Sequence, residues 1–108
     1  MTDLPPTGAI AVIFIAQRTD ADEEGYGRAA QAMDALAAQQ PGYLGIDSTR
    51  GADGFGITVS YWADEASAVA WRAHADHAAI REIGRERWYA QYRLMVTRVE
   101  RAYGWERP

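Results

Sequence analysis

The sequence contains no cysteine and no lysine, and it has only two histidines. Without cysteine, disulfides, thiolate nucleophiles and sulfur-ligated metal sites are excluded. All 11 basic residues are arginine, and 15 acidic residues bring the formal charge to -4. Nonspecific nucleic-acid binding needs a surplus of clustered cations, so we expect no nucleic-acid partner.

Long apolar runs are also missing. The start, MTDLPPTGAI, has neither the basic region nor the apolar region of a signal peptide, and no run approaches the length that spans a bilayer. We therefore expect no membrane partner and a cytoplasmic location. Of the 108 residues, 48% are hydrophobic and 24% are charged, which is the balance of one ordinary globular domain.

What is present is a regular succession of strand and helix patterns. Residues 9–16, AIAVIFIA, are apolar at consecutive positions, as in a strand buried on both faces. Asp20 or Asp22 then caps an amphipathic helix, which the Pro41-Gly42 pair ends.

The second half of the chain continues the pattern. Residues 43–62 form a hairpin around the turn GADG. Asp64 caps a second helix that runs to about His74, and the next segment continues or restarts it, with Gly84 as an end or a kink. Residues 88–101 are rich in aromatic and β-branched residues and form the last and longest strand.

This order of elements predicts an α+β fold of the ferredoxin-like type. A split β-α-β arrangement gives a four-stranded antiparallel sheet with the helices on one face. The domain spans residues 9–103, between a flexible N-terminal segment at 1–8 and a C-terminal tail at 104–108.

Helices on one face leave the other face of the sheet to be covered. The segments AVIFIA, ITVSYW and YRLMV carry large apolar side chains on both faces of their strands. An apolar patch of that size is rarely left wet on a soluble monomer. We therefore predict a homodimer, packed sheet face against sheet face about a two-fold axis.

Several segments carry a family resemblance: AVIFIAQRT, QPGYLGIDSTR, GITVSYW followed by AVAWRAHADH, and GRERWYAQYRLMVTRVER. Together they resemble the antibiotic biosynthesis monooxygenase family of the dimeric α+β barrel superfamily. The likeness is greatest to a branch of small bacterial proteins of unassigned role. It covers residues 9–103 and implies the fold and the dimer, whereas the same scaffold hosts several activities. In this family the last strand reaches toward the partner subunit. The resemblance therefore implies that the homodimer also uses the last strand and that Trp88, Tyr89 and Tyr92, at its start, pack in the interface.

The resemblance implies a pocket between the helices and the sheet of each subunit. In the oxygenases of this family a planar phenol binds there, loses a proton and gives an electron to oxygen, with no metal, flavin or other cofactor. The matching wall in this chain is formed by Phe14, Ala16, Ile57, Val59, Tyr61, Trp71, His74 and Ile80, or by their neighbours on the third strand.

The haem-degrading relatives offer a sharper comparison. They carry a tryptophan on this helix, an iron-ligating histidine ten residues further on, and an asparagine on the first strand. Trp71 matches the tryptophan, but Arg81 lies ten residues later and the first strand has Gln17 or Arg18. Haem degradation is therefore disfavoured, with His77 left as the one histidine that could serve as an axial ligand.

Both histidines lie in the stretch WRAHADHAAIR, residues 71–81. On an unbroken helix, three- and four-residue steps place Trp71, His74, His77 and Arg81 along one stripe. A metal site needs further ligands, and Asp76 lies on the wrong side, so we expect no metal. A neutral imidazole of His77 or His74 can instead act as the base for a phenol. The alternative is that His77 braces the junction between two helical pieces through a backbone hydrogen bond.

Two functions of different classes remain open. The first is a cofactor-independent monooxygenase-like enzyme, an oxidoreductase acting on a small aromatic or quinol-type compound. Its base is His77 or His74, Arg81 and Tyr61 orient the substrate, and Trp71 forms a wall. The second is a non-catalytic dimeric protein that binds a small molecule or has a structural role. Trp62 and Trp71 fit core positions better than a substrate platform.

Overall fold

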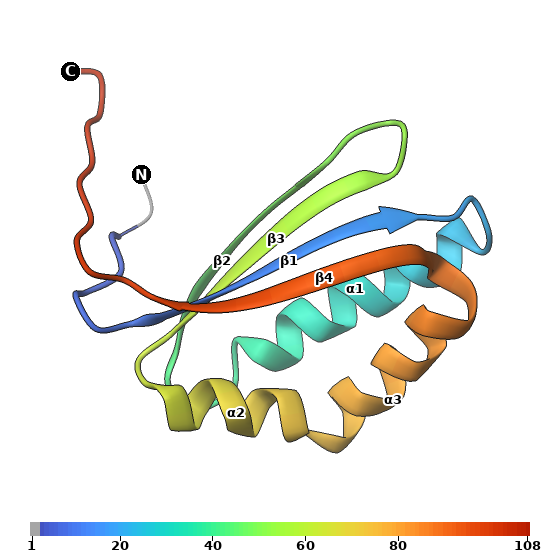
Figure 1. Cartoon of the computed structure of the whole chain (residues 1–108), viewed down its shortest axis with the longest axis horizontal. Helices are drawn as coiled ribbons and strands as arrows, with labels where there is room; N and C mark the ends of the chain where they lie inside the picture. Colours follow the sequence, from blue (N-terminus) through green and yellow to red (C-terminus); the bar gives the residue numbers. More distant parts are fainter. Residues whose placement is uncertain (1–2) are drawn as a thin grey trace.

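The computed structural model describes residues 3–108, apart from the side chain of Ala75, and contains one sheet with helices on one side (Figure 1). The elements are β1 (Ile10–Arg18), α1 (Glu23–Ala37), β2 (Tyr43–Arg50), β3 (Phe55–Trp62), α2 (Glu65–Ala73), α3 (Ala75–Ile83), the π-helix η1 (Gly84–Trp88) and β4 (Tyr89–Arg98). All pairings are antiparallel, in the order β2-β3-β1-β4. The predicted ferredoxin-like α+β fold is confirmed.

Side chains at the predicted positions begin the first two helices. The carboxylate of Asp22 accepts a hydrogen bond from the Gly25 amide at 3.2 Å, and that of Asp64 accepts one from the Ser67 amide at 2.8 Å. Each bond satisfies a backbone amide that has no partner inside the helix. The first helix ends at Ala37, ahead of the Pro41-Gly42 pair, and a short turn leads into β2.

The end of the helical region agrees with the prediction at one point and differs at another. The α-helix α3 ends at Ile83 with Gly84 as its C-cap, as predicted, but the chain then continues as the π-helix η1 before the last strand begins. The predicted start of the last strand at Trp88 is therefore wrong by one residue. Trp88 is only 4% exposed, and its indole Nε1 donates to the carboxylate of Asp22 at 3.2 Å. It packs inside its own subunit rather than in an interface.

Strand register fixes which side chains face the helices. Ile10 pairs with Trp62, and Val12 with Ser60, so alternate residues of β1 and β3 share the covered face. Trp62 is completely buried and packs with Ile10, Ala37 and Ala68. This cluster is the centre of the core.

The opposite face of the sheet has no cover among the described residues. It carries Ile13 and Ile15 of β1, Ile57 and Val59 of β3, and Met95 of β4, which alternate with the covered positions. Ile57 is 36% exposed and Met95 is 39% exposed. All helices lie on the other side (Figure 1). This uncovered face is the surface for which the sequence predicts a partner copy.

The N-terminal segment joins the sheet through main-chain hydrogen bonds. The Gly8 amide donates to the Val99 carbonyl at 2.8 Å, and the Val99 amide donates to the Ala9 carbonyl at 2.8 Å. Residues 1–2 of the segment predicted to be flexible lie outside the described residues. Of the helices in residues 3–108, none has the length and apolar character needed to cross a bilayer.

The buried indole of Trp62 generates a test of this packing. Trp62→Ala removes a ring that lies 5.7 Å from Tyr43 and 6.0 Å from Trp71, between centroids. We expect the free energy of unfolding to fall by about 3–5 kcal/mol, measured by urea denaturation followed by far-UV circular dichroism. The matched control is Trp105→Ala, since Trp105 is 71% exposed. Equal urea midpoints for the two variants would contradict the packing.

Candidate ligand-binding site

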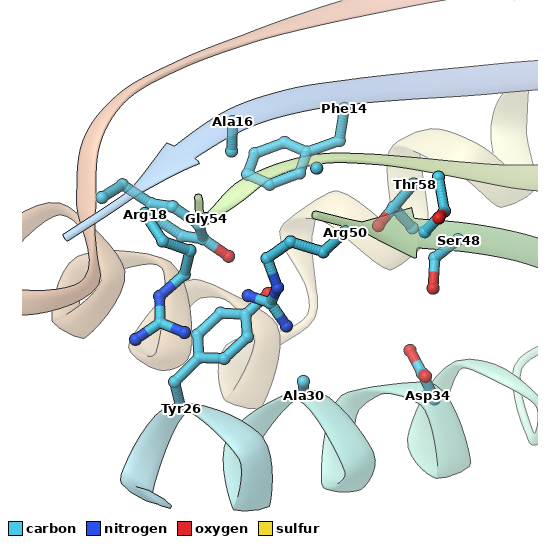
Figure 2. Close-up of a pocket in the computed structure, with 13 residues that line it drawn as sticks. Phe14, Ala16, Arg18, Tyr26, Ala30, Asp34, Ser48, Arg50, Gly54 and Thr58 are labelled. Carbon is cyan, nitrogen blue, oxygen red and sulfur yellow. The ribbon is translucent and has the colours of Figure 1, made fainter. Parts of the chain in front are cut away.

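A cavity of about 240 Å³ lies between α1 and the covered face of the sheet (Figure 2). Its walls come from α1 and from all four strands. The volume is somewhat below the range of roughly 300–1,000 Å³ typical of small-molecule pockets. We therefore expect it to suit a ligand of one or two fused rings better than a larger polycycle.

Small residues create this space. Gly56 of β3 pairs with Ala16 of β1 on one side and with Arg50 of β2 on the other, and Ala30 of α1 faces them across the gap. A Cβ atom at position 56 would lie 3.2 Å from the Cβ of Arg50, so glycine also lets the stem of that arginine lie close to the sheet. The cavity exists because the two middle strands carry almost no side-chain volume on the inner face at this row.

Aromatic side chains form one wall. The ring of Phe14 packs edge-on against Tyr89, with centroids 5.4 Å apart, and Tyr89 lies 5.9 Å from Tyr26. Burial raises the pKa of the Tyr89 phenol, and a hydrogen bond with Tyr26 raises it further, although the charges of Arg18 and Arg50 act in the opposite direction. Tyr89 is therefore a neutral wall and hydrogen-bonding group at neutral pH.

Two arginines lie at one end of the cavity, around a single aromatic ring. The guanidinium carbons of Arg18 and Arg50 are 3.8 Å and 4.3 Å from the centroid of the Tyr26 ring. Cation–π contacts of this kind stabilise both groups. Among residues 3–108 neither arginine forms an ion pair.

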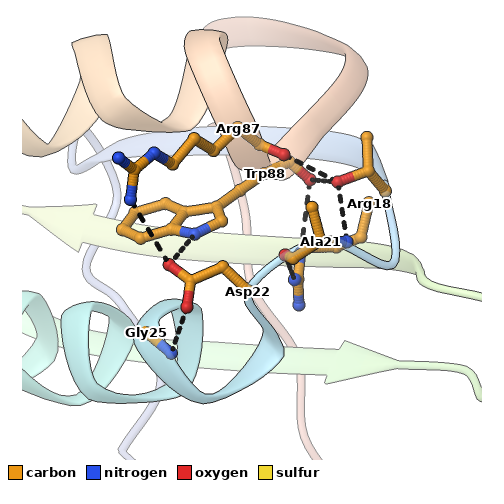
Figure 3. A network of polar contacts seen from close by, with 7 residues as sticks. Arg18, Ala21, Asp22, Gly25, Arg87 and Trp88 are labelled. Carbon is orange, nitrogen blue, oxygen red and sulfur yellow. Dashed lines mark hydrogen bonds and ion pairs between the residues drawn. The ribbon is translucent and has the colours of Figure 1, made fainter.

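The main chain holds Arg18 in place (Figure 3). Its Nε donates to the Trp88 carbonyl at 3.3 Å, and one terminal nitrogen donates to the Ala21 carbonyl at 3.2 Å. The residue is 9% exposed and is the one buried charged residue in the described part of the chain. Its partners are neutral dipoles, so its positive charge is oriented but not neutralised.

Oxygen atoms mark the other end of the cavity. Tyr26, Ala30 and Asp34 follow one another at four-residue steps on one face of α1, which places the two ends about 12 Å apart along the helix. Asp34 lies on the side of Ser48 and Thr58 (Figure 2). Partial burial raises the pKa of the Asp34 carboxyl above its ordinary value. This end can accept a proton or a hydrogen bond.

The predicted substrate residues do not all meet in this cavity. Phe14 lines it, whereas Val59 and Tyr61 project from the uncovered face, where the hydroxyl of Tyr61 donates to Asp47 at 3.1 Å. Phe14, Val59 and Tyr61 therefore do not share one wall, because Phe14 pairs with Thr58, and Val59, the next residue along β3, points to the opposite face. Thr58, between Ile57 and Val59, takes the inner position. Ligand contact by Val59 and Tyr61 stays a prediction.

Trp71 and the two histidines lie together at the break between α2 and α3. The ring of His77 stacks on Trp71 with centroids 4.5 Å apart, and Trp71 in turn stacks on Trp62. His77 Nδ1 lies 3.1 Å from the Trp71 carbonyl, and His74 Nδ1 accepts from the Asp76 amide at 3.2 Å. Both imidazoles thus bond to main chain at the helix junction, and neither lines the described cavity. Their role as a catalytic base stays a prediction.

The remaining predicted residues also belong to the region of α3. Ile80 is half-buried, and a terminal nitrogen of Arg81 donates to the Arg72 carbonyl at 3.2 Å. The Nε of Arg81 is buried and has no hydrogen-bond partner in the described structure. Contact of Ile80 and Arg81 with a ligand likewise stays a prediction, since they lie outside the lining of the cavity.

Sequence reasoning missed the residues that give the cavity its chemistry, namely Arg18, Arg50, Tyr26 and Asp34. The available signal for the helix side was the placement of Tyr26, Ala30 and Asp34 at successive four-residue steps. In the part of the chain that the structure describes, no group of three or more histidine, aspartate or glutamate side chains could hold a metal ion.

The burial of His77 generates a prediction about pH. Burial lowers its pKa below the ordinary value of 6.5, the hydrogen bond to Trp71 opposes this, and the nearby charges of Arg81 and Arg72 add to the lowering. Below pH 6.5 the unfolded chain therefore binds a proton that the folded chain resists, so this contribution to stability is lost as pH falls. Between pH 7.5 and 5.5 we expect the urea midpoint to fall further for the wild type than for His77→Gln. Parallel losses in the two proteins would contradict this.

Comparison with known proteins agrees with this architecture. Residues 9–83 match the model of the family described as Antibiotic biosynthesis monooxygenase. The uncharacterized protein YqjZ of Bacillus subtilis (strain 168) is 45% identical over 101 residues, which cover 94% of this chain and 88% of that protein.

Solved structures show the same fold at low sequence identity. SnoaB, a cofactor-independent oxygenase from Streptomyces nogalater, superposes with a TM-score of 0.69 at 16% identity, covering 85% of this chain and 95% of that one. A conserved protein from Methanosarcina mazei Go1 gives a TM-score of 0.77 at 13% identity, covering 86% and 94%. The family match spans most of the described domain, and the chain belongs to the antibiotic biosynthesis monooxygenase family.

Proposed function

We propose that the protein is a cofactor-independent, monooxygenase-like enzyme for a small aromatic or quinol-type compound that binds in the α1–sheet cavity. The cavity itself carries the proposal, because it combines an aromatic wall with a cationic end and an oxygen-bearing end. Family membership supports the reaction class, and SnoaB is a relative in fold that is described as a cofactor-independent oxygenase.

The reaction begins with deprotonation of the bound phenol. The resulting phenolate is the electron-rich form of the ligand, which can give an electron to oxygen. Molecular oxygen is the co-substrate. With a hydroquinone, two electrons and two protons pass to oxygen and give a quinone and hydrogen peroxide. With an anthrone, one oxygen atom joins the ring carbon, and the other leaves as water with the two displaced hydrogens.

Two assignments of the base follow from different observations. His77 and His74 have the residue type that the sequence points to, and they suit a ligand that extends toward α2 and α3, near Trp71, Ile80 and Arg81. Asp34 lines the described cavity, and partial burial raises its pKa above the ordinary value. For a ligand inside this cavity we assign the proton acceptor to Asp34.

A homodimer is part of the proposal. The uncovered face of the sheet carries several large apolar side chains and has no cover within the described chain. A second copy packed sheet against sheet removes these side chains from water. Val59 and Tyr61, which project from this face, then contact the partner.

The competing function is a non-catalytic, small-molecule-binding dimer of the same fold. It uses the same cavity but leaves the ligand unchanged. The hydrogen bonds that tie both histidines to main chain favour it over catalysis by imidazole.

Oxygen uptake separates the two functions. With a panel of hydroquinones and anthrones in an oxygen electrode, we expect the wild type to consume oxygen faster than buffer. Ala30→Leu places a larger side chain in the cavity and should lower the rate at least about tenfold, since one leucine fills much of such a space. The matched control is Ala35→Leu, on the exposed side of the same helix.

The base is assigned in the same assay. We expect Asp34→Asn to lose most of the rate while His77→Ala and His74→Ala keep it, and the reverse pattern would return the role to the histidines. If wild type and Ala30→Leu both match buffer while the wild type still binds the compounds, the non-catalytic function holds.

The dimer has its own test. By light scattering after size exclusion we expect a molar mass of twice the 11.9 kDa of one chain. Ile57→Glu places a charge on the uncovered face and should shift the protein to the mass of one chain, because burying an unpaired carboxylate is costly. Val69→Glu is the matched control, since Val69 is 60% exposed on α2. A wild type that runs as a monomer at micromolar concentration would contradict the dimer.

A further inference from the structure

The cationic end of the cavity lacks a counter-charge. Arg18 and Arg50 flank the ring of Tyr26 with their guanidinium carbons within 3.8 Å and 4.3 Å of its centroid. Among residues 3–108 no carboxylate forms an ion pair with either of them. The chain as a whole is acidic, with a formal charge of -4, so a pair of unneutralised cations in one cavity is a local exception.

Burial raises the energetic cost of these unneutralised charges. Arg18 is 9% exposed, and desolvating a guanidinium costs free energy that its bonds to two carbonyls only partly offset. Bringing a second guanidinium to the same ring adds repulsion between like charges. A bound anion offsets both costs. Arginine also presents its donors in a planar fork that matches a carboxylate.

The other walls define the rest of the ligand. Phe14 and Tyr89 offer aromatic surface, and Ala16, Gly56 and Ala30 leave a narrow space between helix and sheet. Asp34, Ser48 and Thr58 supply oxygen atoms at the end remote from the arginines (Figure 2). A flat ring system with an acidic group at one end and a hydroxyl at the other matches the aromatic wall, the cationic end and the oxygen-bearing end of the cavity.

We propose that the α1–sheet cavity takes an aromatic carboxylate, whose acid group is held by Arg18 and Arg50 and whose hydroxyl points toward Asp34. The inference rests on the proposed function in that it names the substrate class of the same cavity. The carboxylate anchors the ring, and the hydroxyl at the far end is the group that loses its proton.

The test compares two ligands that differ in one charge. 6-Hydroxy-2-naphthoate carries the acid and the hydroxyl at opposite ends of two fused rings, and 6-hydroxy-2-naphthamide is its neutral counterpart. By isothermal titration calorimetry at pH 7.5 and low salt, we expect the wild type to bind the naphthoate at least about tenfold more tightly than the amide.

Substitution of Arg50 assigns the preference to this end of the cavity. Arg50 is exposed, so Arg50→Gln should fold normally, and we expect it to bring the two ligands to within about threefold of each other. Arg50→Lys keeps the charge without the planar fork and should give an intermediate ratio. The control is Arg28→Gln, which removes the same charge from an exposed position on α1 outside the cavity.

Three results would overturn the inference. They are equal affinity of the wild type for both ligands, an unchanged ratio in Arg50→Gln, and an equal loss of preference in Arg28→Gln. A fourth result, tighter binding of 2-naphthyl phosphate than of the naphthoate, would overturn the assignment of a carboxylate ligand and favour a phosphate. Because binding is measured without turnover, these outcomes are independent of oxygen uptake. If the protein consumes oxygen with neutral hydroquinones but binds the naphthoate no more tightly than the amide, the proposed function holds and the inference of an acidic ligand fails.

Discussion

The guanidinium of Arg18 connects parts of the chain that are far apart in sequence. Arg18 is the last residue of β1. Its guanidinium donates to the carbonyl of Trp88 in η1 and to that of Ala21 ahead of α1, and it lies over the ring of Tyr26 on α1. A buried charge is tolerated only where its donors are satisfied, so these contacts fix how α1 and η1 meet the sheet. The shape of the cavity and its positive end both depend on this one side chain.

Much of the fold followed from local patterns. Asp22 and Asp64 cap the helices as their positions indicated, and the turn between β2 and β3 lies at the glycine-rich segment, as predicted. The π-helix could not be predicted, because the polar residues between Gly84 and Trp88 give no local signal for a wider turn, and Trp88 fits the start of a strand. What selects the wider turn is the packing of the Trp88 indole against Asp22 and Tyr26, a contact between residues far apart in the chain.

The site was harder to predict than the fold. Sequence reasoning concentrated on His74 and His77 because imidazoles carry chemistry, yet both bond to main chain where two helices meet. Arg18 and Arg50 come from different strands, and only the sheet register and the ring of Tyr26 bring them together. Alternation along one strand separates its inner from its outer residues. It does not give the register between strands, and that register pairs Phe14 with Thr58 rather than with Val59.

The open space of the cavity depends on three small residues among those that line it. At Ala16 and Ala30 a modestly larger side chain would narrow the space without reaching the caps or the core cluster, whereas one at Gly56 would also press on the Thr49 carbonyl and on Arg50 of β2. Ligand choice can thus drift independently of architecture across homologues. Comparing the residues at these three positions across family members would separate those with an open cavity from those in which side chains fill it, before any of them is assayed.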